Sequence, residues 1–100
     1  MPVPLSEATE ARLVQLFSGD DLVRARELLE SDCAENIAGW QMAGLDRLRI
    51  AILKLSDGSM SRLVDALVLA QTDFRDALVS AGFADDPRAH ERWWPMLDAS

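Results

Sequence analysis

His90 and Cys33 are the only imidazole and the only thiol in the chain, so they are the first candidates for chemistry. One of each, far apart in sequence, does not form the ligand cluster that a zinc site needs. Nucleophilic catalysis needs a nucleophile, a base and a group that orients the base. His90 lies in a segment that we expect to be a surface helix, and no GxSxG, Cys–His or Gly-rich phosphate-loop motif accompanies it. We therefore predict no catalytic residue, no metal site and no cofactor, and a protein that is not an enzyme.

Neighbouring carboxylates are the next candidates, because such pairs can perform acid–base catalysis or bind calcium. They occur at Asp20-Asp21, at Asp73 and Asp76, and at Asp85-Asp86. Each pair falls at the start of a predicted helix, where acidic side chains cap the backbone and interact with the helix dipole. No EF-hand spacing is present, so we interpret these pairs as helix-start residues.

Adjacent tryptophans near the end of the chain are the strongest indication of a partner, since tryptophan is enriched in binding hot spots. Neighbouring residues on a helix point about 100° apart, so Trp93 and Trp94 cannot easily face one core. One is expected to close the bundle while the other covers Pro95 or a loop, or else contacts a partner. The partner-binding candidates are Trp93, Trp94, Met96, Leu97 and Trp40.

Apolar spacing of three and four residues predicts the elements that position these side chains. We expect a single all-α domain over residues 1–100, a compact bundle of five to six short helices. The expected helices are about 6–17, 21–32, 45–56, 60–71, 74–81 and 87–94, with an irregular loop at 33–44. A strand at Ile50–Leu55 is the competing interpretation for a short apolar run.

Local signals support these boundaries. The expected N-caps are Ser6, Asp20 or Asp21, Ser59, Thr72 or Asp73, and Asp86 ahead of Pro87. Gly58 suits a turn, and Gly82 with Phe83 suits a Schellman-like helix end. Helix 45–56 has little polar surface and should be central. The inward side chains expected in helix 60–71 are Leu63, Val64, Leu67, Val68 and Ala70.

The net charge of −7 bears on the partner class. Residues 1–50 carry five basic and nine acidic side chains, and residues 51–100 carry five and eight. Neither half is a basic arm, which disfavours nucleic acid and anionic membranes. A helix-turn-helix across 60–81 would present two acids and one arginine in its second helix, a poor match to phosphates. No signal peptide or spanning segment is expected, and a lone cysteine fits a reducing cytoplasm.

Three segments, RLRIAILKLSDGS, TDFRDALVSAGF and DDPRAHERWW, between Arg47 and Trp94, resemble small uncharacterised bacterial all-helical proteins. In size and helix number the chain also resembles the death-fold-like adaptors and the bacterial effector-associated domains. The second resemblance rests on architecture, and it implies protein–protein contact in signalling or defence.

Two functions follow as expectations. The first is a non-catalytic interaction module, an adaptor or an oligomerisation domain of a bacterial signalling or defence system, located in the cytoplasm. Its partner would be another protein or a second copy, not nucleic acid, membrane or a small-molecule substrate. The alternative is a small acidic inhibitor, such as an immunity protein, an antitoxin or a nucleic-acid mimic, that captures a basic enzyme. DNA binding and catalysis rank below both.

Overall fold

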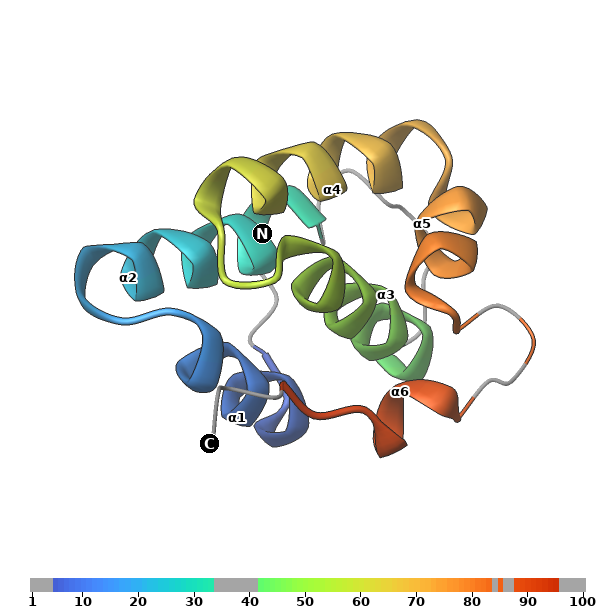
Figure 1. Cartoon of the computed structure of the whole chain (residues 1–100), viewed down its shortest axis with the longest axis horizontal. Coiled ribbons are helices and arrows are strands. Elements are labelled where there is room, and N and C mark those ends of the chain that lie inside the picture. Colours follow the sequence, from blue (N-terminus) through green and yellow to red (C-terminus); the bar gives the residue numbers. More distant parts are fainter. Residues whose placement is uncertain (1–4, 34–41, 84, 86–87, 96–100) are drawn as a thin grey trace.

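The computed structural model describes residues 5–33, 42–83, 85 and 88–95 (Figure 1). Within these residues the chain forms six α-helices and no strand: α1 (Glu7–Leu16), α2 (Gly19–Leu28), α3 (Met42–Ser56), α4 (Met60–Thr72), α5 (Phe74–Ala81) and α6 (Ala89–Arg92). A π-helical turn, η1 (Leu29–Cys33), continues α2. The predicted all-α class is confirmed, and the strand alternative is wrong because its residues lie inside α3. No described helix is long and apolar enough to cross a membrane.

The helix α3 is the centre of the bundle, with α4 on one side, α1 and α6 on the other, and α5 across one end (Figure 1). Its side chains from Leu48 to Leu53 are all buried, including that of Arg49. A helix that is buried all round must have neighbours on every side. The predicted central position of this helix is therefore confirmed.

Capping side chains set several of the helix boundaries, as predicted. Ser6 accepts a hydrogen bond from the Thr9 backbone N–H, and Ser59 and Asp73 do the same at the starts of α4 and α5. At the end of α5, Gly82 adopts a φ of +81° and the Phe83 N–H reaches the Leu78 carbonyl at 2.9 Å. This is the Schellman arrangement expected there.

Three predicted boundaries are wrong. The predicted loop 33–44 ends early, because α3 already begins at Met42; residues 34–41 lie outside the described part of the chain. Gly44 costs a helix only about 1 kcal/mol. The helix expected at 21–32 begins at Gly19 with Ser18 as N-cap, so Asp20 and Asp21 are first-turn acids rather than caps.

The third correction concerns the last helix, expected at 87–94 but observed as Ala89–Arg92. Its N-cap residue is Arg88, while Asp86 and Pro87 lie outside the described residues. At its other end Trp93 is extended, with φ −87° and ψ 133°. Pro95 disfavours helical backbone in the residue before it, which contributes to the early end.

The turn between α3 and α4 depends on Gly58. Both Asp57 and Gly58 have positive φ, of +50° and +80°. A Cβ atom on Gly58 would lie 3.3 Å from the Leu16 carbonyl oxygen at the end of α1. The predicted glycine turn therefore also packs closely against α1, a contact that local sequence patterns did not predict.

Candidate functional site

Arg12 lies on α1, and its residue surface is only 2% exposed. Its side chain binds backbone carbonyls of residues 90–93. Its Nε donates to the Trp93 carbonyl at 2.8 Å, and its Nη2 lies 3.2 Å from the carbonyls of both His90 and Glu91. Its Nη1 donates to the Ala8 carbonyl at 2.8 Å. Arg12 therefore fixes the segment 88–95, which we term the C-terminal strap, against α1.

The partners of Arg12 explain how a guanidinium can be buried here. The last carbonyls of a helix have no intrahelical donor, and they carry the negative end of the helix dipole. Burial lowers the pKa of Arg12, and the nearby Glu91 carboxylate opposes that effect. The His90 carbonyl also accepts from the Trp93 N–H at 3.4 Å, whereas Pro95 has no N–H to offer the Glu91 carbonyl. Arg12 therefore supplies a donor that the backbone beyond α6 cannot provide.

Trp93 and Trp94 differ in burial, but both follow α6, so the helical spacing assumed in the sequence analysis does not apply to them. Trp93 is half-buried and packs against the core, whereas Trp94 is 46% exposed. The Arg12 guanidinium lies 3.8 Å from the centre of the Trp94 ring, a cation–π contact that occupies one face of the indole. Of the other predicted partner-binding residues, Trp40, Met96 and Leu97 lie outside the described residues.

His90 is not the surface residue that we expected. It is half-buried, its Nδ1 is shielded from solvent and has no hydrogen-bond partner among the described residues, and its ring meets Phe83 edge-on with 6.4 Å between the ring centres. Beside it is a pocket of about 300 Å³, close to the lower limit for small-molecule sites. The pocket is lined by Ala8, Arg12, Asp46, Ile50, His90, Glu91 and Trp94.

The chemistry available in this pocket is limited. Its lining offers carboxylates and an imidazole but no hydroxyl or thiol nucleophile, and Arg12 already donates to four carbonyls. Among the residues that the structure describes, no three His, Cys, Asp or Glu side chains gather as metal ligands. The pocket thus lies at the place where Arg12 holds the strap against α1.

The state of His90 predicts how stability depends on pH. Burial lowers the pKa of His90, Arg12 and Arg47 lower it further, and Glu91 and Asp46 oppose the shift. The unfolded chain therefore binds a proton at a higher pH than the folded chain does. We expect the free energy of unfolding to fall as the pH drops below about 6.5, until the folded-state pKa is passed.

Urea denaturation between pH 7.5 and 5 measures this effect. The His90→Gln variant should show a shallower fall over the same range, because glutamine has no proton to bind. Equal slopes for the two proteins would contradict the expectation.

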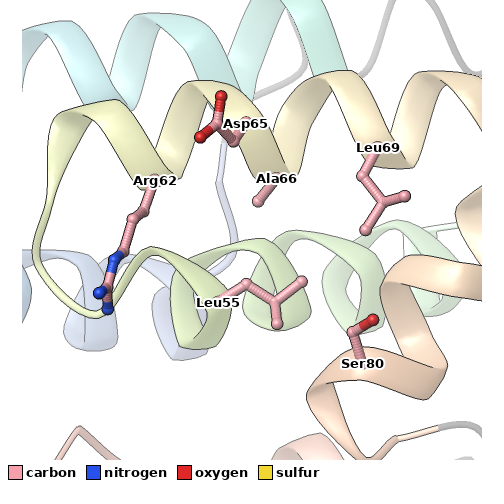
Figure 2. Close-up of a pocket in the computed structure, with 6 residues that line it drawn as sticks. All are labelled: Leu55, Arg62, Asp65, Ala66, Leu69 and Ser80. Atoms are coloured by element: carbon pink, nitrogen blue, oxygen red, sulfur yellow. The ribbon is translucent and has the colours of Figure 1, made fainter.

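A second cavity lies between α3, α4 and α5, and Figure 2 shows its lining. We term it the α4 groove; it has a volume of about 240 Å³ and is lined by Leu55, Arg62, Asp65, Ala66, Leu69 and Ser80. Leu55, Leu69 and Ser80 point into one space from three helices, and Arg62 lies at one end (Figure 2). The groove can therefore receive an apolar side chain from outside.

Two valines of α4 correct the sequence-based assignment of its faces. Val64 and Val68 were expected inward, but they are 43% and 55% exposed. The buried side chains of α4 are Leu63, Ala66, Leu67 and Ala70. At 100° per residue, Asp65 lies between the groove side of α4 and the side of these valines. The solvent-facing side of α4 thus has apolar side chains along both of its borders: Leu69 at the groove, and Val64 and Val68 on the other side of Asp65.

Comparison of the chain with protein-family models, with curated proteins and with solved structures found no significant match.

Proposed function

We propose that this protein is a non-catalytic helical module that binds another protein through the α4 groove. The observation that carries the proposal is an open apolar groove bounded by three helices of one bundle. Central apolar pockets that receive one anchor side chain are typical of binding hot spots. The exposed valines on α4 lie across Asp65 from the groove and form a separate apolar area that a partner could also cover.

The groove supports this function better than the tryptophans do. The contacts of Arg12 with Trp93 and Trp94 fasten the strap to α1, which is a structural role. In the lining of the groove, Leu55 and Leu69 are partly exposed and Ser80 is exposed, and among the described residues the ion pair of the lining is that of Arg62 with Asp57. A partner could therefore bury the side chains of Leu55, Leu69 and Ser80 without breaking a hydrogen bond that the structure shows for them.

The distribution of acids favours an interaction module over an acidic inhibitor. Exposed carboxylates occur on α1, α2, α4, α5 and α6, for example at Glu7, Asp20, Asp65, Asp76 and Glu91. A nucleic-acid mimic would concentrate its charge on one face. The architectural resemblance to death-fold-like adaptors suggests a signalling or defence assembly as the setting.

Filling the groove tests the proposal. Ser80→Phe would place a ring in the groove without changing charge, and Gln15→Phe on the exposed side of α1 is the matched control. A partner identified from the native host and then purified should bind Ser80→Phe at least about tenfold more weakly than wild type, a loss of about 1.4 kcal/mol. Gln15→Phe should bind like wild type.

Both substitutions are at exposed positions, so each should change stability by less than about 0.5 kcal/mol. Urea denaturation of both variants checks this. A partner that binds Ser80→Phe as tightly as wild type, or the capture of no partner at all, would contradict the proposal.

A further inference from the structure

We infer that the α4 groove binds a basic segment of a partner protein. One large apolar side chain of that segment fills the groove, and Lys or Arg side chains beside it meet Asp65 and Asp76. The inference rests on the proposed function and adds to it the chemistry of the partner.

The size and lining of the groove define the anchor. Its volume of about 240 Å³ is below the range of about 300–1,000 Å³ typical of small-molecule sites. Leu55, Ala66 and Leu69 offer aliphatic surface, with Ser80 as the polar group that points in beside Leu69 (Figure 2). A single leucine, methionine or aromatic side chain suits such a space better than a polar metabolite does.

Two carboxylates flank the position of the anchor. Asp65 lines the groove from α4, and Asp76 lies one turn before Ser80 on the same side of α5. Both are exposed, and neither takes part in an ion pair with the described residues. Arg62 is the cation of the lining, and it lies 3.7 Å from the Asp57 carboxylate. Arg75, beside Asp76 on α5, is also exposed. Counting Asp57, Asp65 and Asp76 against Arg62 and Arg75, the surface around the groove has a net charge of −1.

The nearby cations of α3 donate hydrogen bonds to backbone carbonyls at the end of α5. Lys54 precedes Leu55 of the groove, but its Nζ donates to the Ala81 carbonyl at 2.7 Å and lies 5.0 Å from the Phe83 ring centre. Arg47 donates to the Phe83 carbonyl. These cations keep their charge, but their hydrogen bonds hold them at the end of α5, and neither forms an ion pair with Asp65 or Asp76 among the described residues. A cation of a partner can therefore pair with these two carboxylates.

A second copy of the chain is the less favoured occupant. Each copy carries a net charge of −7, which opposes association of like chains. A basic heterologous segment removes this penalty and gains from electrostatic steering.

Selection of peptides on the full-length protein tests the inference. We expect a random 12-residue displayed library to yield peptides with one large apolar residue flanked by Lys or Arg, and Ser80→Phe to abolish their binding. The Asp65→Asn/Asp76→Asn double variant should weaken their Kd about 2- to 10-fold at 50 mM salt, and less at 500 mM. The control Asp20→Asn/Asp21→Asn, with the same charge change on α2, should have little effect.

Several results would overturn the inference. Groove-dependent peptides that lack basic residues, or that ignore the Asp65 and Asp76 substitutions, would remove the charge requirement while leaving the proposed function intact. Failure to select any peptide sensitive to Ser80→Phe would remove the groove as a peptide site. A dimer in analytical ultracentrifugation that Ser80→Phe dissociates would make a second copy the occupant.

Discussion

The Arg12→Ala variant should lose about 3–5 kcal/mol of unfolding free energy and should release the C-terminal strap. The substitution removes the donor to the carbonyls of His90, Glu91 and Trp93 at once. It also leaves a void beneath the Trp94 ring, where the guanidinium now lies. A short helix such as α6 has little stability of its own, so we expect it to detach before the rest of the bundle unfolds.

Two measurements separate strap release from general destabilisation. Urea denaturation gives the overall loss, and trypsin cleavage after Arg92 under native conditions should become faster in Arg12→Ala. Arg12→Lys keeps the charge but cannot reach three carbonyls with a planar fork, so it should recover less than half of the loss. Arg24→Ala, at an exposed position of α2, should stay within about 0.5 kcal/mol of wild type. Unchanged cleavage in Arg12→Ala would contradict the role assigned to Arg12.

The elements that sequence patterns located well are those defined by neighbours in the chain. Ser6, Ser59 and Asp73 cap helices through hydrogen bonds to residues two or three positions away. The Gly82 helix end is likewise local. Both partners of each such contact lie within a few residues of one another, which is why these boundaries could be predicted.

The features that the sequence did not reveal depend on residues far apart in the chain. Arg12 contacts carbonyls about 80 positions away, and Lys54 reaches the end of α5 across 27 positions. Nothing in the local composition distinguishes Arg12 from an exposed arginine such as Arg24. The acceptors are backbone carbonyls, which every residue has, so no partner side chain marks the contact in the sequence.

The α4 groove was hidden for a different reason. Apolar residues at 63, 64, 67 and 68 form a stripe wider than the core needs, and the pattern alone does not say which edge is buried. In the structure Leu63 and Leu67 are buried, and α4 packs against α3, α5, η1 and α2. The exposed valines lie across Asp65 from the groove, whose α4 lining is Arg62, Asp65, Ala66 and Leu69. The apolar stripe of the sequence therefore indicates a second exposed apolar area and does not mark the groove.

Four cations that donate to backbone carbonyls also affect how the net charge is distributed: Arg12 and Arg49 are buried, and Arg47 and Lys54 are half-buried. Arg12, Arg47, Arg49 and Lys54 donate to backbone carbonyls, so at least four of the ten cations are engaged in fastening helices. Many of the seventeen acids remain exposed. The surface that a partner meets is therefore more acidic than the ratio of ten to seventeen suggests.

Arg49 provides the second large expected effect. Its side chain is fully buried within α3, and its Nε donates to the Leu29 carbonyl at 3.1 Å. That carbonyl lies where α2 changes into the π-helical turn η1, a point at which the regular α-helical pattern stops. We expect Arg49→Ala to lower the free energy of unfolding by about 3–5 kcal/mol, since it leaves both a cavity and a buried acceptor without its donor.

Comparing two substitutions separates the cavity from the lost hydrogen bond. Arg49→Met fills most of the volume but donates nothing, so it should retain a loss of about 1–3 kcal/mol from the unsatisfied Leu29 carbonyl. Arg62→Ala, which removes an exposed arginine on α4, should cost less than about 1 kcal/mol. If Arg49→Ala proves too unstable to purify, Arg49→Met still decides the question by urea denaturation and by amide exchange at η1. A stability for Arg49→Met equal to that of wild type would show that the carbonyl finds another donor and that Arg49 does not fasten α2 to α3.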